Sequence, residues 1–174
     1  MNRPVEPGRF ALGCAPLGNL YRATDDQTAF EVVDTAWSRG VRVFDTAPLY
    51  GHGLSESRVG AALAARPREE FLLASKVGRL LVADDPAVSA APTIFADVPP
   101  VHPVFDFSGD GVLRSVEESL GRLGLDRIDI VHVHDPDDHL DEAALGAFPA
   151  LVRLRDEGVI GAIGLGTNTV AVGD

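Results

Sequence analysis

A regular alternation of strand-like and helix-like segments constrains the fold more than any other feature of this chain. Short apolar runs, typical of buried strands, alternate with segments in which apolar residues recur every three or four positions, as in amphipathic helices. No hairpin signal joins two strand patterns. This order predicts a parallel sheet with right-handed helical crossovers, either doubly wound or part of a (β/α)8 barrel. Residues 11–19 are expected to form a strand that leads into a tight turn, and further strands are expected at 41–47, 71–76, 128–134 and 159–168. The expected helices lie at 24–40, 55–65, 113–123 and 141–157.

The periodicity stops between residues 80 and 107. This stretch is rich in proline, which is rare inside helices and central strands. Long irregular segments inside compact domains are usually lids or binding loops. We therefore expect residues 80–107 to form a long loop on the side of a functional site. The prolines of this stretch are Pro86, Pro92, Pro99, Pro100 and Pro103.

Length and charge narrow the class of protein. The 174 residues predict a single domain over 1–174, long enough to bury a sizeable core. The only cysteine, Cys14, excludes a disulfide framework, and no metal site is expected. The formal charge, 15 − 26 = −11, argues against binding to nucleic acid or to an anionic membrane surface. Because no signal peptide or membrane span is found, we expect a cytoplasmic protein.

Polar residues stand at the ends of the expected strands, where parallel α/β folds bind their ligands. Side chains two positions apart share one face of a strand, so Asp45, Lys76 and His134 each continue an apolar face. If those faces point into a barrel, the three groups converge at one rim, within reach of Tyr50. A doubly wound sheet would bury such charges beneath helices. We therefore expect the N-terminal part of a (β/α)8 barrel, with about five parallel strands and intervening helices.

Each of these residues also has a simpler interpretation. Asp45 can cap a turn, Tyr50 can pack, and His134 can belong to the turn at Asp135. Lys76 can be a solvated charge, but it is the single lysine among 15 basic residues. A lysine ammonium is a compact charge that can share a proton, whereas a guanidinium stays protonated. The joint placement of the four residues favours a functional site.

Five segments carry a resemblance to a known family. They resemble the aldo-keto reductase superfamily, in particular its aldose dehydrogenase branch of the D-threo-aldose or fucose type. The resemblance implies a (β/α)8 barrel that binds NAD or NADP without a Rossmann glycine fingerprint, and no GxGxxG occurs here. It also implies a small aldose or aldehyde as substrate. The segments are LGCAPLGNLY, VFDTAPLYGHGLSE, LLASKVGR, RLGLDRIDIVHVHDPD and GAIGLGTN.

The resemblance also implies a catalytic tetrad of Asp45, Tyr50, Lys76 and His134. Hydride transfer to a carbonyl carbon leaves negative charge on oxygen, which needs a proton donor. A free tyrosine has a pKa of about 10, and a neighbouring ammonium lowers such a value. Tyr50 would then be the general acid or base, with Lys76 beside it and Asp45 holding Lys76. His134 would orient the carbonyl.

The cofactor contacts are implied in the same way. Asn168 matches the residue that binds the nicotinamide carboxamide, and Asp45 lies beside that site. Cys14 and Ala15, at the end of the first strand, either line the cofactor through their backbone or simply pack. His132 shares the inward face with His134 one layer lower, and we interpret it as a core histidine with satisfied hydrogen bonds.

The resemblance covers about the first half of the family's chain, so we expect the chain to be truncated after the fifth strand. An open parallel sheet leaves unpaired backbone groups on its first and last strands, which favours self-association. A hypothesis of another class therefore stays open. In it, the chain is a non-catalytic half-barrel that serves as a binding or assembly module.

Overall fold

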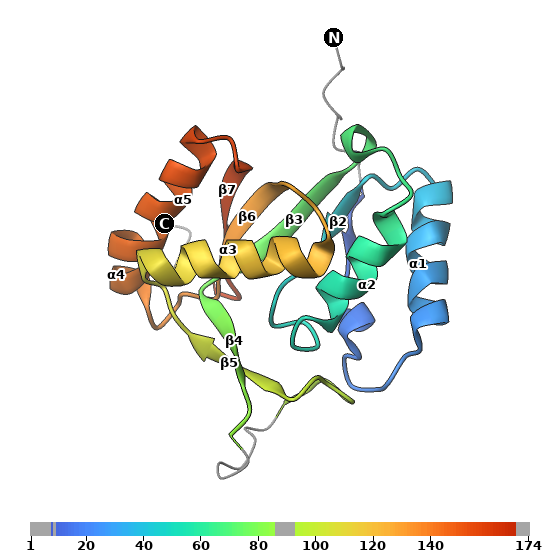
Figure 1. Ribbon diagram of the computed structural model, residues 1–174, viewed down its shortest axis with the longest axis horizontal. Coiled ribbons are helices and arrows are strands. Elements are labelled where there is room, and N and C mark those ends of the chain that lie inside the picture. Colours follow the sequence, from blue (N-terminus) through green and yellow to red (C-terminus); the bar gives the residue numbers. More distant parts are fainter. Residues whose placement is uncertain (1–7, 9, 86–92, 170–174) are drawn as a thin grey trace.

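The computed structural model describes residues 8, 10–85 and 93–169, and it shows one parallel sheet with helices packed against its outer face (Figure 1). The strands of this sheet that are neighbours in space are also neighbours in chain order. The two strands at 79–83 and 101–105, called the excursion below, form a separate sheet. A doubly wound sheet reverses its order at a switch point, whereas a barrel wall does not. The order therefore fits the barrel hypothesis. The strands of the sheet are β1 (Leu12–Gly13), β2 (Val43–Asp45), β3 (Leu72–Val77), β6 (Ile128–His134) and β7 (Ile160–Gly166).

Within the described residues five α-helices lie between the strands in chain order, and α3 crosses in front of β3 and β6 in the view of Figure 1. None of the helices in the described ranges is both long and apolar enough to cross a membrane. The last helical stretch is broken, as its sequence predicts, with a π-helical turn at Ala143–Ala147 and Pro149 in the first turn of the helix that follows. The α-helices are α1 (Asp26–Ser38), α2 (Leu54–Leu63), α3 (Gly109–Leu123), α4 (Leu140–Glu142) and α5 (Phe148–Asp156).

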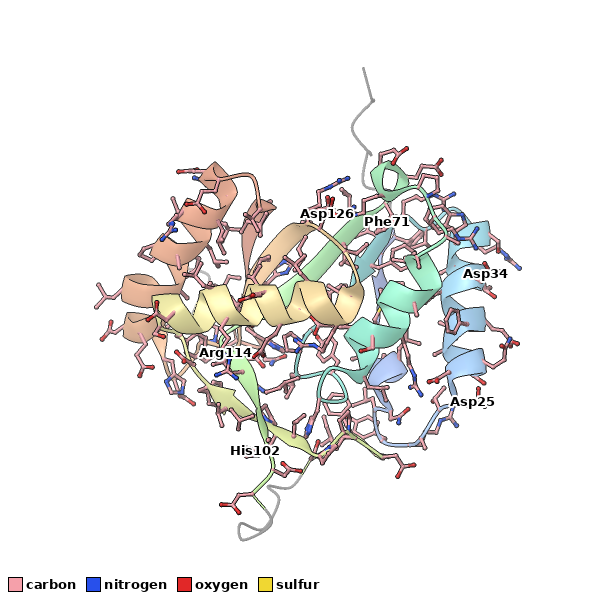
Figure 2. The ribbon with its side chains drawn as sticks, viewed as in Figure 1. Asp25, Asp34, Phe71, His102, Arg114 and Asp126 are labelled. Carbon is pink, nitrogen blue, oxygen red and sulfur yellow. The ribbon has the colours of Figure 1, made fainter. Side chains whose placement is uncertain are left out.

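Side-chain caps fix where the two longest helices begin. The Asp25 carboxylate accepts the Thr28 N–H at 2.7 Å and so caps α1 (Figure 2). Ser108 does the same for α3, because its Oγ accepts the Gly111 N–H at 3.0 Å. Gly124 ends α3 in the left-handed conformation, with φ of 65°. These caps fix the start of α1 and both ends of α3.

The hydrophobic core lies between the sheet and its helices. Alternate residues of β6, Val131 and Val133, are almost fully buried in this core, so His132 and His134 point to the opposite face. The same alternation places Lys76 opposite Val77 on β3. The parity predicted from the sequence is therefore present. Other core residues are Phe44, Val59, Leu63, Phe71, Leu73, Val112, Val116, Leu123 and Leu151.

The two ends of the loop expected over 80–107 form strands instead of irregular structure. A strand β4 (Arg79–Ala83) pairs antiparallel with β5 (Val101–Phe105), and this ribbon extends away from the sheet (Figure 1). Proline is tolerated in β5 because a two-stranded ribbon leaves one side of each strand unpaired. Gly78, with φ of 103°, separates β4 from β3. Residues 86–92 of the expected loop lie outside the described residues.

The contact between α2 and α3 yields a stability prediction. A Cβ added at Gly60 would lie 2.1 Å from the Leu123 carbonyl oxygen, so the helices meet backbone to backbone. Gly60→Ala is expected to lower the free energy of unfolding by about 1–3 kcal/mol, because the helices must separate. Gly121→Ala on α3 is the control, since its Cβ meets nothing within 4 Å. It is expected to raise stability by about 0.5–1 kcal/mol through helix propensity. Urea unfolding of both variants decides, and equal stabilities would contradict the prediction.

Candidate active site

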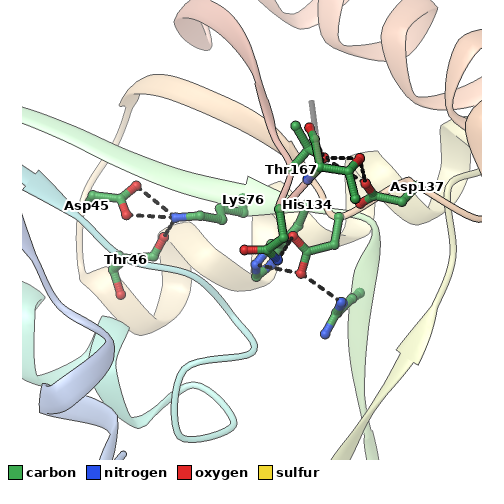
Figure 3. A network of polar contacts seen from close by, with 10 residues as sticks. Asp45, Thr46, Lys76, His134, Asp137 and Thr167 are labelled. Atoms are coloured by element: carbon green, nitrogen blue, oxygen red, sulfur yellow. Dashed lines mark hydrogen bonds and ion pairs between the residues drawn. The ribbon is translucent and has the colours of Figure 1, made fainter. Parts of the chain in front are cut away.

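Lys76, at the carboxyl end of β3, is held by three oxygen atoms. Its Nζ donates to the two carboxylate oxygens of Asp45 at 2.7 and 2.9 Å and to the carbonyl of Thr46 at 3.0 Å (Figure 3). Only 9% of the Lys76 side chain is exposed. A solvated surface charge is therefore excluded, and Asp45 serves to hold a buried ammonium.

Tyr50 lies on the turn that follows β2, against this ammonium. The Lys76 Nζ is 4.9 Å from the centroid of the Tyr50 ring. The turn is fixed by close backbone packing, since a Cβ at Gly51 would lie within 3 Å of the Gly18 backbone. Gly51 also has a positive φ of 64°. Glycine is needed here both for the conformation and for the close approach, which places Tyr50 beside Lys76.

His134, at the carboxyl end of β6, completes the cluster. Its ring centroid is 5.9 Å from that of Tyr50, and the two rings are perpendicular. Burial lowers the pKa of His134 to about 3, and the positive charges of Arg79 and Lys76 act in the same direction. His134 is therefore neutral near pH 7 and can act as a hydrogen-bonding group without carrying charge.

Most of the predicted site residues line one cavity of about 390 Å³. Asp45 is absent from its lining and reaches it through Lys76. The cavity opens between the carboxyl ends of the strands and the segment around Phe95, which lies within the loop expected at 80–107. Its lining includes Ala15, Leu20, Tyr21, Leu49, Tyr50, Lys76, Ile94, Phe95, His134, Asp135, Thr167 and Asn168.

Cys14 and His132 behave differently from the other candidates. Cys14 is fully buried in the core, its carbonyl accepts the Ser55 hydroxyl at 2.8 Å, and burial raises the pKa of its thiol to about 12. The Cys14 side chain thus packs in the core and is absent from the cavity lining, while Ala15 reaches the cavity. His132 faces inward as expected, but its buried Nδ1 has no hydrogen-bond partner, so the expectation of satisfied hydrogen bonds is wrong for this ring atom. Its inward neighbour on β7 is Gly164, which leaves no side chain there to pair with the ring.

The sequence interpretation missed two charged residues at the site. Arg79 Nη2 donates to Asp135 Oδ2 at 3.1 Å, and Asn168 Nδ2 donates to Asp135 Oδ1 at 3.1 Å. The Asp135 carboxylate also lies 3.6 Å from Nε2 of His134. Both missed residues stand inside segments that carry the family resemblance, LLASKVGR and VHVHDPD. Asp135 followed by a proline was interpreted as a simple turn, which hid its place in the cavity.

Comparison with known proteins identifies the family of this chain. A model of the Aldo/keto reductase family matches residues 9–173. The chain belongs to this family. A D-threo-aldose 1-dehydrogenase from a Pseudomonas species is 46% identical over an alignment of 159 residues, and the match covers 89% of this chain and 48% of that protein. Pyridoxal 4-dehydrogenase from Microbacterium luteolum is 36% identical over 90% of this chain and 51% of its own length.

Solved aldo-keto reductases support the fold. Glycerol dehydrogenase from Gluconobacter oxydans superposes with a TM-score of 0.70 and 30% identity, over 94% of this chain and 46% of that chain. The predicted architecture, the N-terminal part of a (β/α)8 barrel, is therefore confirmed. The chain spans about half the length of the curated relatives it matches.

The pKa of His134 makes the stability of this aldo-keto reductase chain depend on pH. Because the folded-state pKa lies below the unfolded value of about 6.5, protons bind the unfolded chain more readily. The contribution of neutral His134 to the free energy of unfolding is fully present above about pH 6.5. It is lost progressively as the pH falls toward 3. Between pH 7 and pH 5 we expect a loss on the order of 1–2 kcal/mol from this residue.

Protonation of carboxylates also lowers the free energy of unfolding at low pH. Two variants separate the effect of His134 from that of the carboxylates. His134→Gln cannot gain a proton and is expected to flatten the fall in stability between pH 7 and pH 5, measured by urea unfolding. His102→Gln is the control, because His102 lies on the excursion with a partly exposed ring (Figure 2). Identical pH dependence in the original chain and in His134→Gln would contradict the assignment of a buried neutral histidine.

Proposed function

We propose that this chain carries the acid–base groups of an NAD(P)-dependent oxidoreductase, which moves a hydride between nicotinamide and the carbonyl or hemiacetal carbon of an aldose or aldehyde. One observation above all supports the proposal. The single lysine of the chain is buried, fixed by Asp45 and Thr46, and placed 4.9 Å from the ring of Tyr50 at a cavity. A buried charge that is held this firmly beside a tyrosine fits proton transfer better than it fits stabilisation, because desolvation cancels much of an ion pair's gain.

Tyr50 is the proton donor when the carbonyl is reduced. As negative charge develops on the carbonyl oxygen, the Tyr50 hydroxyl gives its proton to that oxygen. The phenolate that remains is stabilised by the ammonium of Lys76, whose own position is fixed by Asp45. In the oxidation direction the phenolate takes the proton from the substrate hydroxyl.

His134 orients the substrate rather than exchanging protons with it. With a pKa of about 3 it stays neutral across the working range of such an enzyme. A neutral imidazole next to Tyr50 can hydrogen-bond the substrate oxygen without repelling Lys76. The perpendicular packing of the two rings keeps both side chains at the same cavity.

The cavity also fits the carboxamide of a nicotinamide ring. The Asn168 side chain, bonded to Asp135 at 3.1 Å, has both a donor and an acceptor, which matches a carboxamide group. Ala15, with its small side chain, also lines the cavity. When bound, the nicotinamide supplies or accepts the hydride. The choice between NAD and NADP stays open, and the cytoplasmic location stays a prediction.

Turnover tests the proposed function. The product of the complete reading frame that contains these residues should form reduced nicotinamide from NAD or NADP with an aldose, and should consume it with an aldehyde, as followed by absorbance. The 174-residue chain alone should bind NADH and NADPH more weakly than micromolar, measured by fluorescence titration, since it spans half of its relatives. Absence of turnover with both cofactors in both directions would contradict the proposal.

The open sheet supports a second candidate, the assembly module. Within the described ranges β1 and β7 each pair with one neighbour, β2 and β6, so each has an unpaired edge. In that case the chain should form a dimer at micromolar concentration in sedimentation experiments, and its stability should rise with concentration. Turnover without such association favours the oxidoreductase.

A further inference from the structure

A second charged pair, Arg79 with Asp135, adjoins the cavity and has no part in the proton transfer above. Arg79 begins β4, three residues beyond Lys76, and Asp135 directly follows His134. Asp135 lines the cavity together with Tyr50 and His134. The pair therefore connects β4 to the lining of the cavity, next to Tyr50 and His134, where the reacting carbonyl would lie.

The pair carries costs that a simple surface ion pair does not have. Only 19% of the Arg79 side chain and 25% of the Asp135 side chain are exposed. Burial lowers the pKa of Arg79 despite the opposing charge of Asp135, and burial raises the pKa of Asp135. The Arg79 Nε is buried without a partner, and Asp135 adopts a left-handed φ of 45°. Strain and desolvation of this kind concentrate at functional sites.

The Arg79 guanidinium is held so that it can keep the carboxylate in place. Its Cζ lies 4.7 Å from the centroid of the Phe105 ring on β5, and its Nη2 donates to Asp135. On the other side of the carboxylate, Asn168 donates to the second oxygen. Asp135 is thus fixed from both sides, which is the preorganisation that a substrate-binding group requires.

The remaining capacity of Asp135 is for hydrogen-bond donors. A carboxylate has about four acceptor positions, and the two protein donors occupy one on each oxygen. A substrate hydroxyl that enters the cavity can donate to the positions that remain. An unsubstituted aldehyde has no such donor and would leave a partly desolvated carboxylate without compensation, which costs binding energy.

We propose that Asp135, held by Arg79, is a specificity-determining residue that binds a substrate hydroxyl adjacent to the reacting carbonyl. It thereby selects hydroxylated aldehydes and aldoses over aldehydes that lack hydroxyl groups. This inference rests on the proposed oxidoreductase function and names its substrate class from the charges at the cavity.

The test compares two aldehydes that differ only in hydroxyl groups, glyceraldehyde and propanal. The ratio of their kcat/KM values is measured for the product of the complete reading frame. The unsubstituted protein should prefer glyceraldehyde, and Asp135→Ala should reduce the ratio by about 10- to 100-fold, the usual range for a hydrogen bond to a charged group. Effects that act through Asn168 or His134 change both substrates and cancel in the ratio.

Two further variants keep the experiment decisive. Asp135→Asn retains shape and one acceptor oxygen, so it should lower the ratio less than Asp135→Ala, and it serves if the alanine variant melts early. Asp138→Asn is the control, because Asp138 is an exposed carboxylate in the same turn and is absent from the cavity lining. Its ratio should be unchanged.

The outcomes are distinguishable. An equal loss for both aldehydes in Asp135→Ala overturns the inference and makes Asp135 a positioning residue for His134. An unsubstituted protein that turns over both aldehydes without preference also overturns it, while the proposed function stands. A protein that turns over neither aldehyde with NADH or NADPH overturns the proposed function, and the inference with it.

Discussion

Tyr50→Phe is expected to lower kcat of the proposed oxidoreductase by a factor of about 10²–10⁴ and to leave the fold intact. The substitution removes the hydroxyl that gives or takes the proton, and nothing else. The ring should keep its contacts, with a centroid 6.3 Å from Phe95 and 4.9 Å from the Lys76 ammonium. The loss therefore falls on the chemical step rather than on packing.

Rates and melting temperatures of the same variants test this expectation. The chain has two tyrosines, and Tyr21→Phe removes the hydroxyl of the other one, whose residue is 78% exposed at the edge of the same cavity. It should change kcat far less than Tyr50→Phe does. A Tyr50→Phe variant with near-normal turnover would remove Tyr50 from the acid–base assignment and would direct attention to a bound water or to His134.

The sequence predicts the sheet well because strand and helix periodicities are local signals. The five parallel strands and their order follow from apolar runs such as IDIVHVH, and the inward parity of Asp45, Lys76 and His134 follows from alternation along each strand. Alternation also predicts which residues share a rim. Local patterns cannot say which of them touch, so the contacts of Lys76 with Thr46 came only from the structure.

The excursion shows where local patterns fail. RLLVA and VHPVF are each only five residues long, VHPVF contains a proline, and the two strands pair across the long connection 84–100. No periodicity therefore distinguishes them from a loop. Because β4 was missed, its first residue Arg79 could not be placed beside Asp135. Cys14 illustrates the converse limit. Its position at the end of a strand was predicted correctly, but burial of the side chain depends on helix packing that the strand pattern does not encode.

Lys76→Arg is expected to lower kcat by at least about 10² while changing stability only modestly. A lysine ammonium can direct its three donors to three separate acceptors, and here it does so toward both Asp45 oxygens and the Thr46 carbonyl at 2.7–3.0 Å. A guanidinium is planar and larger, and its fork suits a bidentate carboxylate contact. It can keep the ion pair with Asp45, but its charge moves away from the point that stabilises the Tyr50 phenolate.

Stability and rate should therefore separate in this variant. The positive charge partner of Asp45 is retained, so the large cost of breaking a buried ion pair does not apply. A matched exchange at the surface, Arg114→Lys on α3, calibrates the measurement, because Arg114 pairs with Glu118 four residues on and is 54% exposed (Figure 2). That variant should lie within about 0.5 kcal/mol of the original chain, with normal turnover.

The combination of the two readouts decides the role of Lys76. A large fall in kcat with a melting temperature within a few degrees of the original places the effect in the chemical step, where the compact ammonium supports Tyr50. If the free energy of unfolding falls by as much as the activation free energy of turnover rises, Lys76 mainly holds Asp45 and the turn after β2 together. Normal turnover in Lys76→Arg would show that any positive charge suffices at this position. The single lysine of an arginine-rich chain would then have no catalytic explanation.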